Sequence, residues 1–514
     1  MRASLKFKLS DGHNEAQIMN KLAAQYEVKN EPAIVEKFTL YDTFDWRLFN
    51  RSLVLSVSGK KLCLCKLAKT EIIYSIDTTT LPVFLRDLPD CDLKEYLAPI
   101  IKMRALLKLV DVHSRSKPYR VLNRDEKTVA RIVYQETRSS QNQNAPLLMA
   151  YLWIEPVRGY SKYSQNLASR FKAAGFTIDK EESLYFKALA ATGKKPGSYS
   201  AKVNIQLDPR MPSDEAAKTI LRFLLQTMRI NQPYIEKDLD TEFLHDFRVS
   251  VRRTRSALSQ IKSVFPVQTT NRFKKDFAFV GKLSNQLRDL DVYLLKEDSY
   301  KTMLPGVLRT DIDPLFEYLR KKRSQAIKNV VNGLKTKKLA KILNDWETFL
   351  TEPQKKSTTT VNTELPIMDL ARTRIYKKYQ NVVKTGNKII ENTEDEMLHV
   401  LRIECKKLRY LMEFFASLFL GKKINVLIDQ LKKLQDNLGD FNDLCVQEDY
   451  LLNIAEELPA TRQQGNKTLV AIGSLIGALD SRRRTVKDAF ASTFTDFASP
   501  ANQALFRELF ASKA

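Results

Sequence analysis

A histidine followed by regularly spaced basic residues occurs twice in the sequence. The first copy begins at His245 and the second at His399, and each carries Arg or Lys at positions +3, +7, +8 and +10 from its histidine. Guanidinium and ammonium groups bind phosphate oxygens, so a doubled set of cations indicates a site for a phosphate-rich ligand. The cations are Arg248, Arg252, Arg253 and Arg255 in the first copy, and Arg402, Lys406, Lys407 and Arg409 in the second.

The spacing within each copy is typical of an α-helix. At about 100° per residue, the four cations cluster around the histidine, whereas apolar residues at −1, +2, +6 and +13 fall on another face. Each copy is therefore predicted to be one helix with a buried face and a wet, cationic face. The apolar positions are Leu244, Phe247, Val251 and Leu258 in the first copy, and Leu398, Leu401, Cys405 and Met412 in the second.

A second repeated segment follows each histidine helix. Lys282–Asp291 reappears as Lys433–Asn442, which adds Lys282 and Lys433 to the candidate site residues. The repeated unit is thus a helix pair, and self-similarity of this kind predicts pseudo-symmetric helical bundles. We place them at residues 212–350 and 367–514, separated by a polar, mobile segment at 351–366. If the repeats are pseudo-symmetric, the two cationic strips should line one groove.

These residues resemble the CHAD domain, the conserved histidine α-helical domain. The resemblance runs from Pro212 to the C-terminus and rests on the doubled histidine-plus-basic pattern and the doubled Lys-Leu-x-x-x-Leu-x-Asp pattern. It implies non-catalytic binding of inorganic polyphosphate, with location at polyphosphate granules. No cofactor or catalytic residue is implied for this region.

Other interpretations of the repeated histidines are open. Each histidine could be a core residue that donates to Asp289 or Asp440, which would make the pattern purely structural. A metal phosphohydrolase is disfavoured, because the His245-Asp246 pair has Val400 in the second aspartate position. Binding to an RNA or DNA backbone is an alternative, although the strips lack the exposed aromatic residues that stack on bases.

The composition is that of a globular protein with polyanionic partners. Of 514 residues, 43% are hydrophobic, and 84 Lys and Arg against 60 Asp and Glu give a net charge of +24. Nucleic acid, an anionic membrane and polyphosphate all fit this charge. Five cysteines without metal-ligand spacing and the absence of a long apolar run predict a cytoplasmic protein without a membrane segment. The sequence gives no indication of its oligomeric state.

The N-terminal 200 residues have a different pattern. Alternating or continuous apolar segments predict strands at residues 1–9, 53–67, 106–112, 129–134 and 147–154, with helices at 14–26 and 163–174. The chain is therefore predicted to be α+β. An antiparallel, barrel-like or tunnel-like domain at 1–200 precedes the all-α domain at 212–514.

This N-terminal region resembles the CYTH family, whose members form a β-barrel tunnel for triphosphates. The resemblance rests on Tyr41-Asp42-Thr43-x-Asp45-x-x-Leu48 and on the first strand. That strand keeps Lys6 but lacks the two carboxylates that the family uses for metal, and Ser56 and Ser58 replace its alternating arginines. Since metal-dependent hydrolysis needs hard oxygen ligands, we expect no metal site and no catalysis. The competing hypothesis is a metal-dependent triphosphatase.

Overall fold

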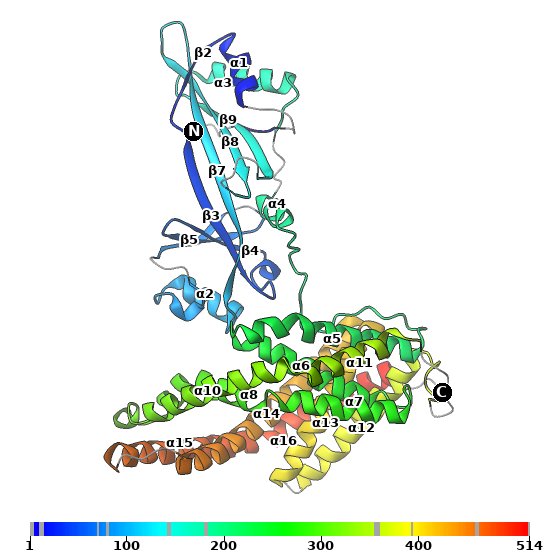
Figure 1. Cartoon of the computed structure of the whole chain (residues 1–514). Coiled ribbons are helices and arrows are strands. Elements are labelled where there is room, and N and C mark those ends of the chain that lie inside the picture. The colour runs from blue at the N-terminus through cyan, green and yellow to red at the C-terminus, as the bar shows by residue number, and fades with distance from the viewer. Residues whose placement is uncertain are drawn as a thin grey trace. The chain divides into compact units, whose positions relative to one another are not determined.

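The computed structural model describes residues 5–9, 15–68, 71–78, 82–140, 145–178, 183–353, 360–391, 394–457 and 462–511. Contacts divide the chain into a sheet unit, Met1–Ser200, and a helical unit, Ala201–Ala514. Both units are drawn in Figure 1. The predicted α+β class is confirmed: an antiparallel sheet is followed by an all-helical region.

The sheet unit is built on one antiparallel sheet with the order β10-β1-β9-β8-β7-β3-β4-β5-β6, and β2 pairs with β7. Among the described strands this path is open, with β10 and β6 at its ends, so backbone pairing does not close the expected barrel. The strands are β1 (Leu5–Lys8), β2 (Glu27–Asn30), β3 (Ile34–Thr43), β4 (Leu53–Ser58), β5 (Lys61–Lys66), β6 (Ile72–Asp77), β7 (Leu106–Leu122), β8 (Thr128–Arg138), β9 (Leu147–Pro156) and β10 (Thr177–Ile178).

Both faces of the long strands are packed, because successive side chains point to opposite sides. In β9, Leu152 and Ile154 join a core under α1 (Glu15–Ala23) and α3 (Ser161–Ala173). Met149 and Tyr151 join a core on the other face with α4 (Leu184–Ala191). A third core packs β4 and β5 against α2 (Asp92–Ile101). Each predicted strand segment overlaps an observed strand and both predicted helices are present, whereas β2, β3, β6, β10, α2 and α4 were not predicted.

The helical unit contains the two repeats. The first comprises α5 (Ser213–Glu236), α6 (Thr241–Gln260), α7 (Val267–Lys282), α8 (Asn285–Leu295), α9 (Glu297–Met303), α10 (Asp313–Leu334) and α11 (Lys337–Thr351). The second comprises α12 (Ile367–Glu391), α13 (Asp395–Phe414), α14 (Gly421–Glu457), α15 (Arg462–Asp488), α16 (Phe490–Phe497) and α17 (Pro500–Phe510).

The two histidine helices are α6 and α13, and their predicted apolar faces are confirmed. All eight apolar positions are at most 4% exposed, from Leu244 and Leu258 in α6 to Leu398 and Met412 in α13. Asp240 caps α6, since its Oδ1 accepts from the backbone N–H groups of Glu242 and Phe243. Each of these two helices is therefore held with its apolar stripe in the core.

The partner of each histidine helix differs between the repeats. In the first repeat the chain breaks into α7 and α8 around Ser284, whereas the second runs as the single helix α14 of 37 residues. In the segment between the repeats, residues 354–359 lie outside the described part. Beyond it, Asn362 and Thr363 bond to the backbone at Ser263 and Val264, which fixes this segment to the loop after α6.

Candidate functional site

Helices α6 and α13 lie against each other, and a buried arginine joins them. Arg253 is 9% exposed and donates to the carboxylate of Glu413 at 2.7 Å and to the carbonyl of Ala201 at 2.8 Å. The expectation that Arg253 lies on the wet face is therefore wrong. Position +8 of α6 lies about 80° around the helix axis from the histidine, on the side that faces the other repeat. There the guanidinium of Arg253 pairs with the carboxylate of Glu413.

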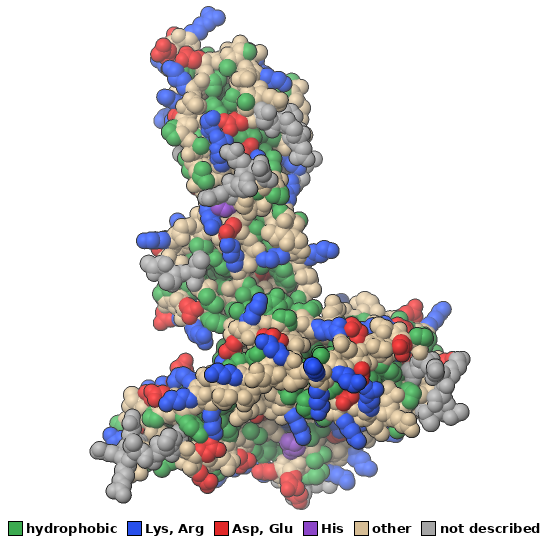
Figure 2. Space-filling view, in the orientation of Figure 1, with side chains coloured by type: hydrophobic (Ala, Val, Ile, Leu, Met, Phe, Trp, Pro, Cys, Tyr) green, Lys and Arg blue, Asp and Glu red, His purple; other side chains and the backbone are tan. Residues whose placement is uncertain are grey.

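The contact between α6 and α13 brings cations of both repeats together. Arg252 of α6 lies close enough to Arg402 and Lys406 of α13 to lower the pKa of both, and it also lowers the pKa of Arg248. We call Arg248, Arg252, Arg402 and Lys406 the cation cluster. On the face drawn in Figure 2, Lys and Arg side chains gather around a histidine of the helical unit.

The cluster is both crowded and partly desolvated. Burial and the neighbouring Arg402 and Arg252 lower the pKa of Lys406 to about 8. Burial, followed by Arg252, lowers the pKa of Arg248 to about 10. Lys406 and Arg252 have no ion pair within the described residues. Burial and nearby like charges both make the ionised form of a cation less stable. An anion bound here would therefore reduce the electrostatic repulsion within the cluster.

Protein groups already occupy part of the cluster. The guanidinium of Arg248 donates to Ser284 Oγ and Asn285 Oδ1, both at 2.9 Å. Arg402, whose side chain is 17% exposed, forms an ion pair with Asp443 at 3.3 Å. Two members are thus oriented by their neighbours, while Arg252 and Lys406 are available to a ligand.

The remaining predicted cations have different surroundings. Arg255 and Lys282 are exposed. Arg255 lies near Gly281, because a Cβ atom built on this glycine would be 3.9 Å from Nη1 of Arg255. Because α7 ends at Lys282, both extend the cluster along the junction of α6 and α7. Lys407 and Arg409 are instead paired with carboxylates of their own helix, Glu404 and Glu413.

Lys433 is exposed on α14, and no described contact places it beside the cluster.

The two histidines are not equivalent core residues. His399 is exposed, and its Nδ1 lies at hydrogen-bond distance, 2.7 Å, from Oδ1 of Asn442. The predicted acceptor Asp440 is thus not its partner. His245 is half-buried on α6. Asn442 also donates to Asp443 at 3.5 Å, so His399 is linked through α14 to the Arg402 ion pair.

Sequence reasoning missed Arg288 and Asp443. Arg288 of α8 is close enough to Arg248 to lower its pKa, but Gly439 occupies the corresponding position of the second repeat. A search for doubled cations could not find it. Asp443 follows the repeated segment directly. Its carboxylate pairs with Arg402 and favours the charged form of Lys406.

In the sheet unit, the residues that carry the motif around Asp42 form a structural turn. Asp42 is 1% exposed and accepts hydrogen bonds from the backbone N–H groups of Thr43, Leu48 and Phe49 at 2.7 to 2.9 Å. Burial raises the pKa of Asp42 to about 6. Asp45 pairs with Arg47 and the buried Arg104. These carboxylates are therefore committed to the chain that follows β3.

The expected tunnel residues Lys6 and Ser56 lie beside aromatic, aliphatic and small side chains. The ammonium of Lys6 stands 3.7 Å from the centre of the Tyr151 ring and 5.1 Å from that of Trp153. Ser56 pairs in register with Leu40 on one side and Cys63 on the other. This face carries the core under α4, where a triphosphate site would need a row of cations. Arg2, Ala3 and Ser4 of the predicted first strand lie outside the described residues.

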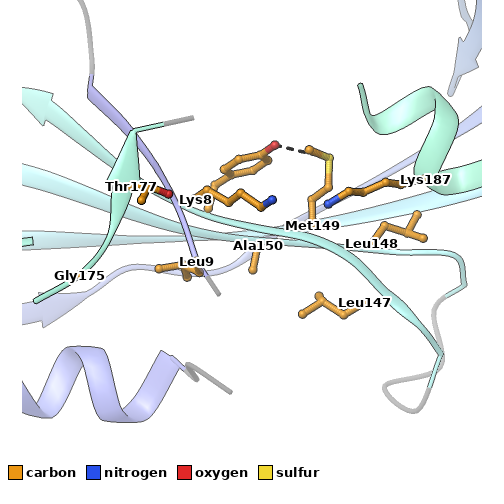
Figure 3. Close-up of a pocket in the computed structure, with 10 residues that line it drawn as sticks. Lys8, Leu9, Leu147, Leu148, Met149, Ala150, Gly175, Thr177 and Lys187 are labelled. Carbon is orange, nitrogen blue, oxygen red and sulfur yellow. Dashed lines mark hydrogen bonds between the residues drawn. The ribbon is translucent and has the colours of Figure 1, made fainter. Parts of the chain in front are cut away.

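A pocket of about 370 Å³ opens beside this face, between β1, β9, β10 and α4. Figure 3 shows the side chains of Lys8 and Lys187 pointing toward one another across it. Tyr151, Thr177, Gly175 and apolar side chains line the rest, and the hydroxyl of Tyr151 donates to the sulfur of Met149 at 3.5 Å. Within the described part of the chain, no group of three or more His, Cys, Asp or Glu side chains could hold a metal ion.

No helix among the described residues combines the length and apolar character needed to cross a bilayer.

Comparison with known proteins identifies the helical unit. Residues 219–452 match the family model of the CHAD domain. Two curated proteins of Mycobacterium tuberculosis, from strains CDC 1551 / Oshkosh and ATCC 25618 / H37Rv and both described as uncharacterized, are 21% identical over 301 residues. The match covers 57% of this chain, and the chain spans about half the length of these relatives, 54%.

Three solved structures are similar to parts of the chain. The CHAD domain of the plant Ricinus communis is 22% identical, with a TM-score of 0.47 over 58% of this chain and 96% of its own. PptA of Streptomyces chartreusis is 14% identical, with a TM-score of 0.44 over 55% of this chain and 100% of its own. A Hippeastrum protein described as having a dominant triphosphatase activity is 12% identical, with a TM-score of 0.24 over 38% of this chain and 99% of its own. By the match of its helical unit to the family model, the chain carries a CHAD domain at residues 219–452.

Proposed function

We propose that the helical unit binds inorganic polyphosphate, without catalysis, at the cation cluster. The observation that carries this proposal is the approach of Arg252 from the first repeat to Arg402 and Lys406 of the second, which lowers the pKa of both. Membership of the CHAD family, which is associated with polyphosphate, supports the same ligand.

The chemistry of the cluster suits a linear phosphate polymer. Each phosphate unit of the polymer carries about one negative charge, and arginine can bind its oxygens with two parallel hydrogen bonds. A polymer laid over the cluster would meet Arg252 and Lys406, then Arg255 and Lys282 along the junction of α6 and α7. Binding would replace like-charge repulsion within the cluster by attraction, which stabilises the complex.

A backbone-only nucleic-acid site is the alternative for the same surface. The test is a titration of the full chain with fluorescently labelled long-chain polyphosphate, competed by tripolyphosphate, RNA and duplex DNA at matched phosphate concentration. We expect long-chain polyphosphate to compete at the lowest phosphate concentration. Stronger competition by RNA or DNA would overturn the proposed ligand.

We also propose that the sheet unit is catalytically inactive. The neighbours described for Lys6 and Ser56 support this, because they are aromatic, aliphatic or small, whereas a triphosphatase needs carboxylates for metal and cations for phosphate on that face. The test is phosphate release from tripolyphosphate with Mg²⁺ or Mn²⁺. Turnover above the buffer rate that Lys6→Ala abolishes would establish the opposite.

Polyphosphate binding would also place the protein on polyphosphate granules. A fluorescent fusion should co-localise with the granules, and the Arg252→Ala/Lys406→Ala variant should be diffuse. Equal recruitment of both proteins would mean that the cluster does not direct localisation.

A further inference from the structure

A second pocket, of about 240 Å³, lies where the two repeats meet. Helix α9 and the end of α8 form one wall, and α14 and α15 form the other. At roughly 30 Å³ per water molecule, the volume holds about eight waters, enough for a phosphate group with part of its hydration. Its polar lining residues are Lys296, Ser299, Tyr300, Asp440, Asp443, Gln447 and Arg482.

The pocket is lined by two cations, Lys296 and Arg482, and two carboxylates, Asp440 and Asp443. Lys296 is half-buried, Arg482 is exposed, and neither forms an ion pair within the described residues. Of the two carboxylates, Asp443 is already paired with Arg402 of α13. Asp443 and Asp440 attract Lys296 from beyond ion-pair distance, so an added anion would give both cations a direct partner.

The pocket wall is held in place by one hydrogen bond between the repeats and one within α14. The hydroxyl of Tyr300, on α9, donates to the side-chain oxygen of Gln447 on α14. Gln447 in turn donates to the carbonyl of Asp443 at 2.6 Å. These bonds fix the α9–α14 contact, so Lys296 and the loop that holds it keep a defined position.

We propose that this pocket takes a second phosphate group of the same bound polymer, between Lys296 of the first repeat and Arg482 of the second. This inference rests on the proposed function. Asp443 connects the two places, because its carboxylate pairs with Arg402 of the cation cluster while the residue lines the pocket. A polymer that leaves the cluster past Asp443 enters the pocket, whereas a short oligophosphate stays at the cluster.

The experiment compares Lys296→Gln/Arg482→Gln with the wild-type full chain. Binding of long-chain polyphosphate and of tripolyphosphate is measured for both proteins. The matched control is Lys328→Gln/Lys341→Gln, which removes two exposed lysines of α10 and α11 that lie outside the pocket lining. Lys296→Arg keeps the charge and should bind as the wild type does. Arg482→Gln alone tests the same point at an exposed position if the double variant does not fold.

We expect the double variant to lose at least fivefold in affinity for the long polymer and less than twofold for tripolyphosphate. The control pair should lose less than twofold for both. Long-polymer affinity equal to that of the control pair would overturn the inference, as would equal losses for both ligands. If the wild type binds no polyphosphate, the proposed function fails. If Arg252→Ala/Lys406→Ala weakens binding and the pocket variant does not, only the second phosphate position fails.

Discussion

Arg253 on α6 and Glu413 on α13 form an ion pair of 2.7 Å between the two repeats, with side chains 11% and 22% exposed. Glu413 also contacts Arg409 of its own helix at 3.2 Å. Arg253→Ala would leave a half-buried carboxylate with one partner fewer. We expect a loss of about 2 kcal/mol in the free energy of unfolding, measured by denaturant titration.

The control for that prediction is Arg255→Ala, two residues along the same helix. Arg255 is exposed, so its replacement should change the unfolding free energy by less than about 0.5 kcal/mol. Equal effects of the two substitutions would contradict the assignment of Arg253 as the link between repeats.

Removing Arg252 and Lys406 together should weaken polyphosphate binding and its salt dependence. Each cation that leaves the cluster removes a charge-assisted contact, and fewer neutralised phosphates release fewer counterions. We expect Arg252→Ala/Lys406→Ala to bind long-chain polyphosphate about tenfold or more weakly, with a shallower slope against salt concentration. Lys328→Ala/Lys341→Ala is the matched control, and an unchanged salt slope in the cluster variant would count against the site.

Polyphosphate binding should take up a proton at Lys406. In the free protein, burial and nearby arginines lower the pKa of Lys406 to about 8. A bound polyanion favours the ammonium form and raises that pKa, so affinity should fall as the pH rises from about 7 to about 9. Calorimetry in two buffers of different ionisation enthalpy measures the uptake. Lys406→Arg keeps the positive charge at every pH tested and should abolish most of the proton uptake. If this variant takes up as many protons as the wild type, the proton binds at another group.

Asp42 should be needed for the fold of the sheet unit and not for ligand binding. Asp42→Ala removes the acceptor of three backbone hydrogen bonds, at a cost of about 2 kcal/mol or more. Hydrogen exchange at the amides of Thr43, Leu48 and Phe49 should accelerate, while polyphosphate affinity stays unchanged. Asp90→Ala is the control, because the Asp90 side chain is fully exposed. Unaltered exchange in Asp42→Ala would show that the turn is held by other contacts.

The helical faces could be predicted because periodicity decides which side of a helix is buried. Leu398 and Phe247 fall on the apolar side by phase alone, and both are in the core. Arg253 could not be placed in this way, since its burial depends on a carboxylate 160 residues away in the other repeat. Lys296 belongs to no doubled pattern, and only the tertiary fold brings it beside Arg482.

In the sheet unit, the sequence predicts individual strands but not how they close or what their motif residues contact. The strands at residues 53–67 follow from alternation and a glycine turn, and β4 and β5 lie there. The sequence motif around Asp42 indicated a family resemblance. The physical role of Asp42 is visible only in the structure, where its carboxylate accepts hydrogen bonds from three backbone N–H groups. Barrel closure depends on which edges pair, and strand patterns within one segment do not specify that.

The proximity of Arg252 to the cations of the second repeat has a consequence for stoichiometry. Although the basic pattern is written twice, cations of both copies lie near one another, so under the proposed function each chain would offer a single class of binding site. A long polymer would then be loaded by successive protein molecules, with a spacing set by the width of the helical unit. At saturation, the mass of protein bound per phosphate should report that footprint and not the number of repeated motifs.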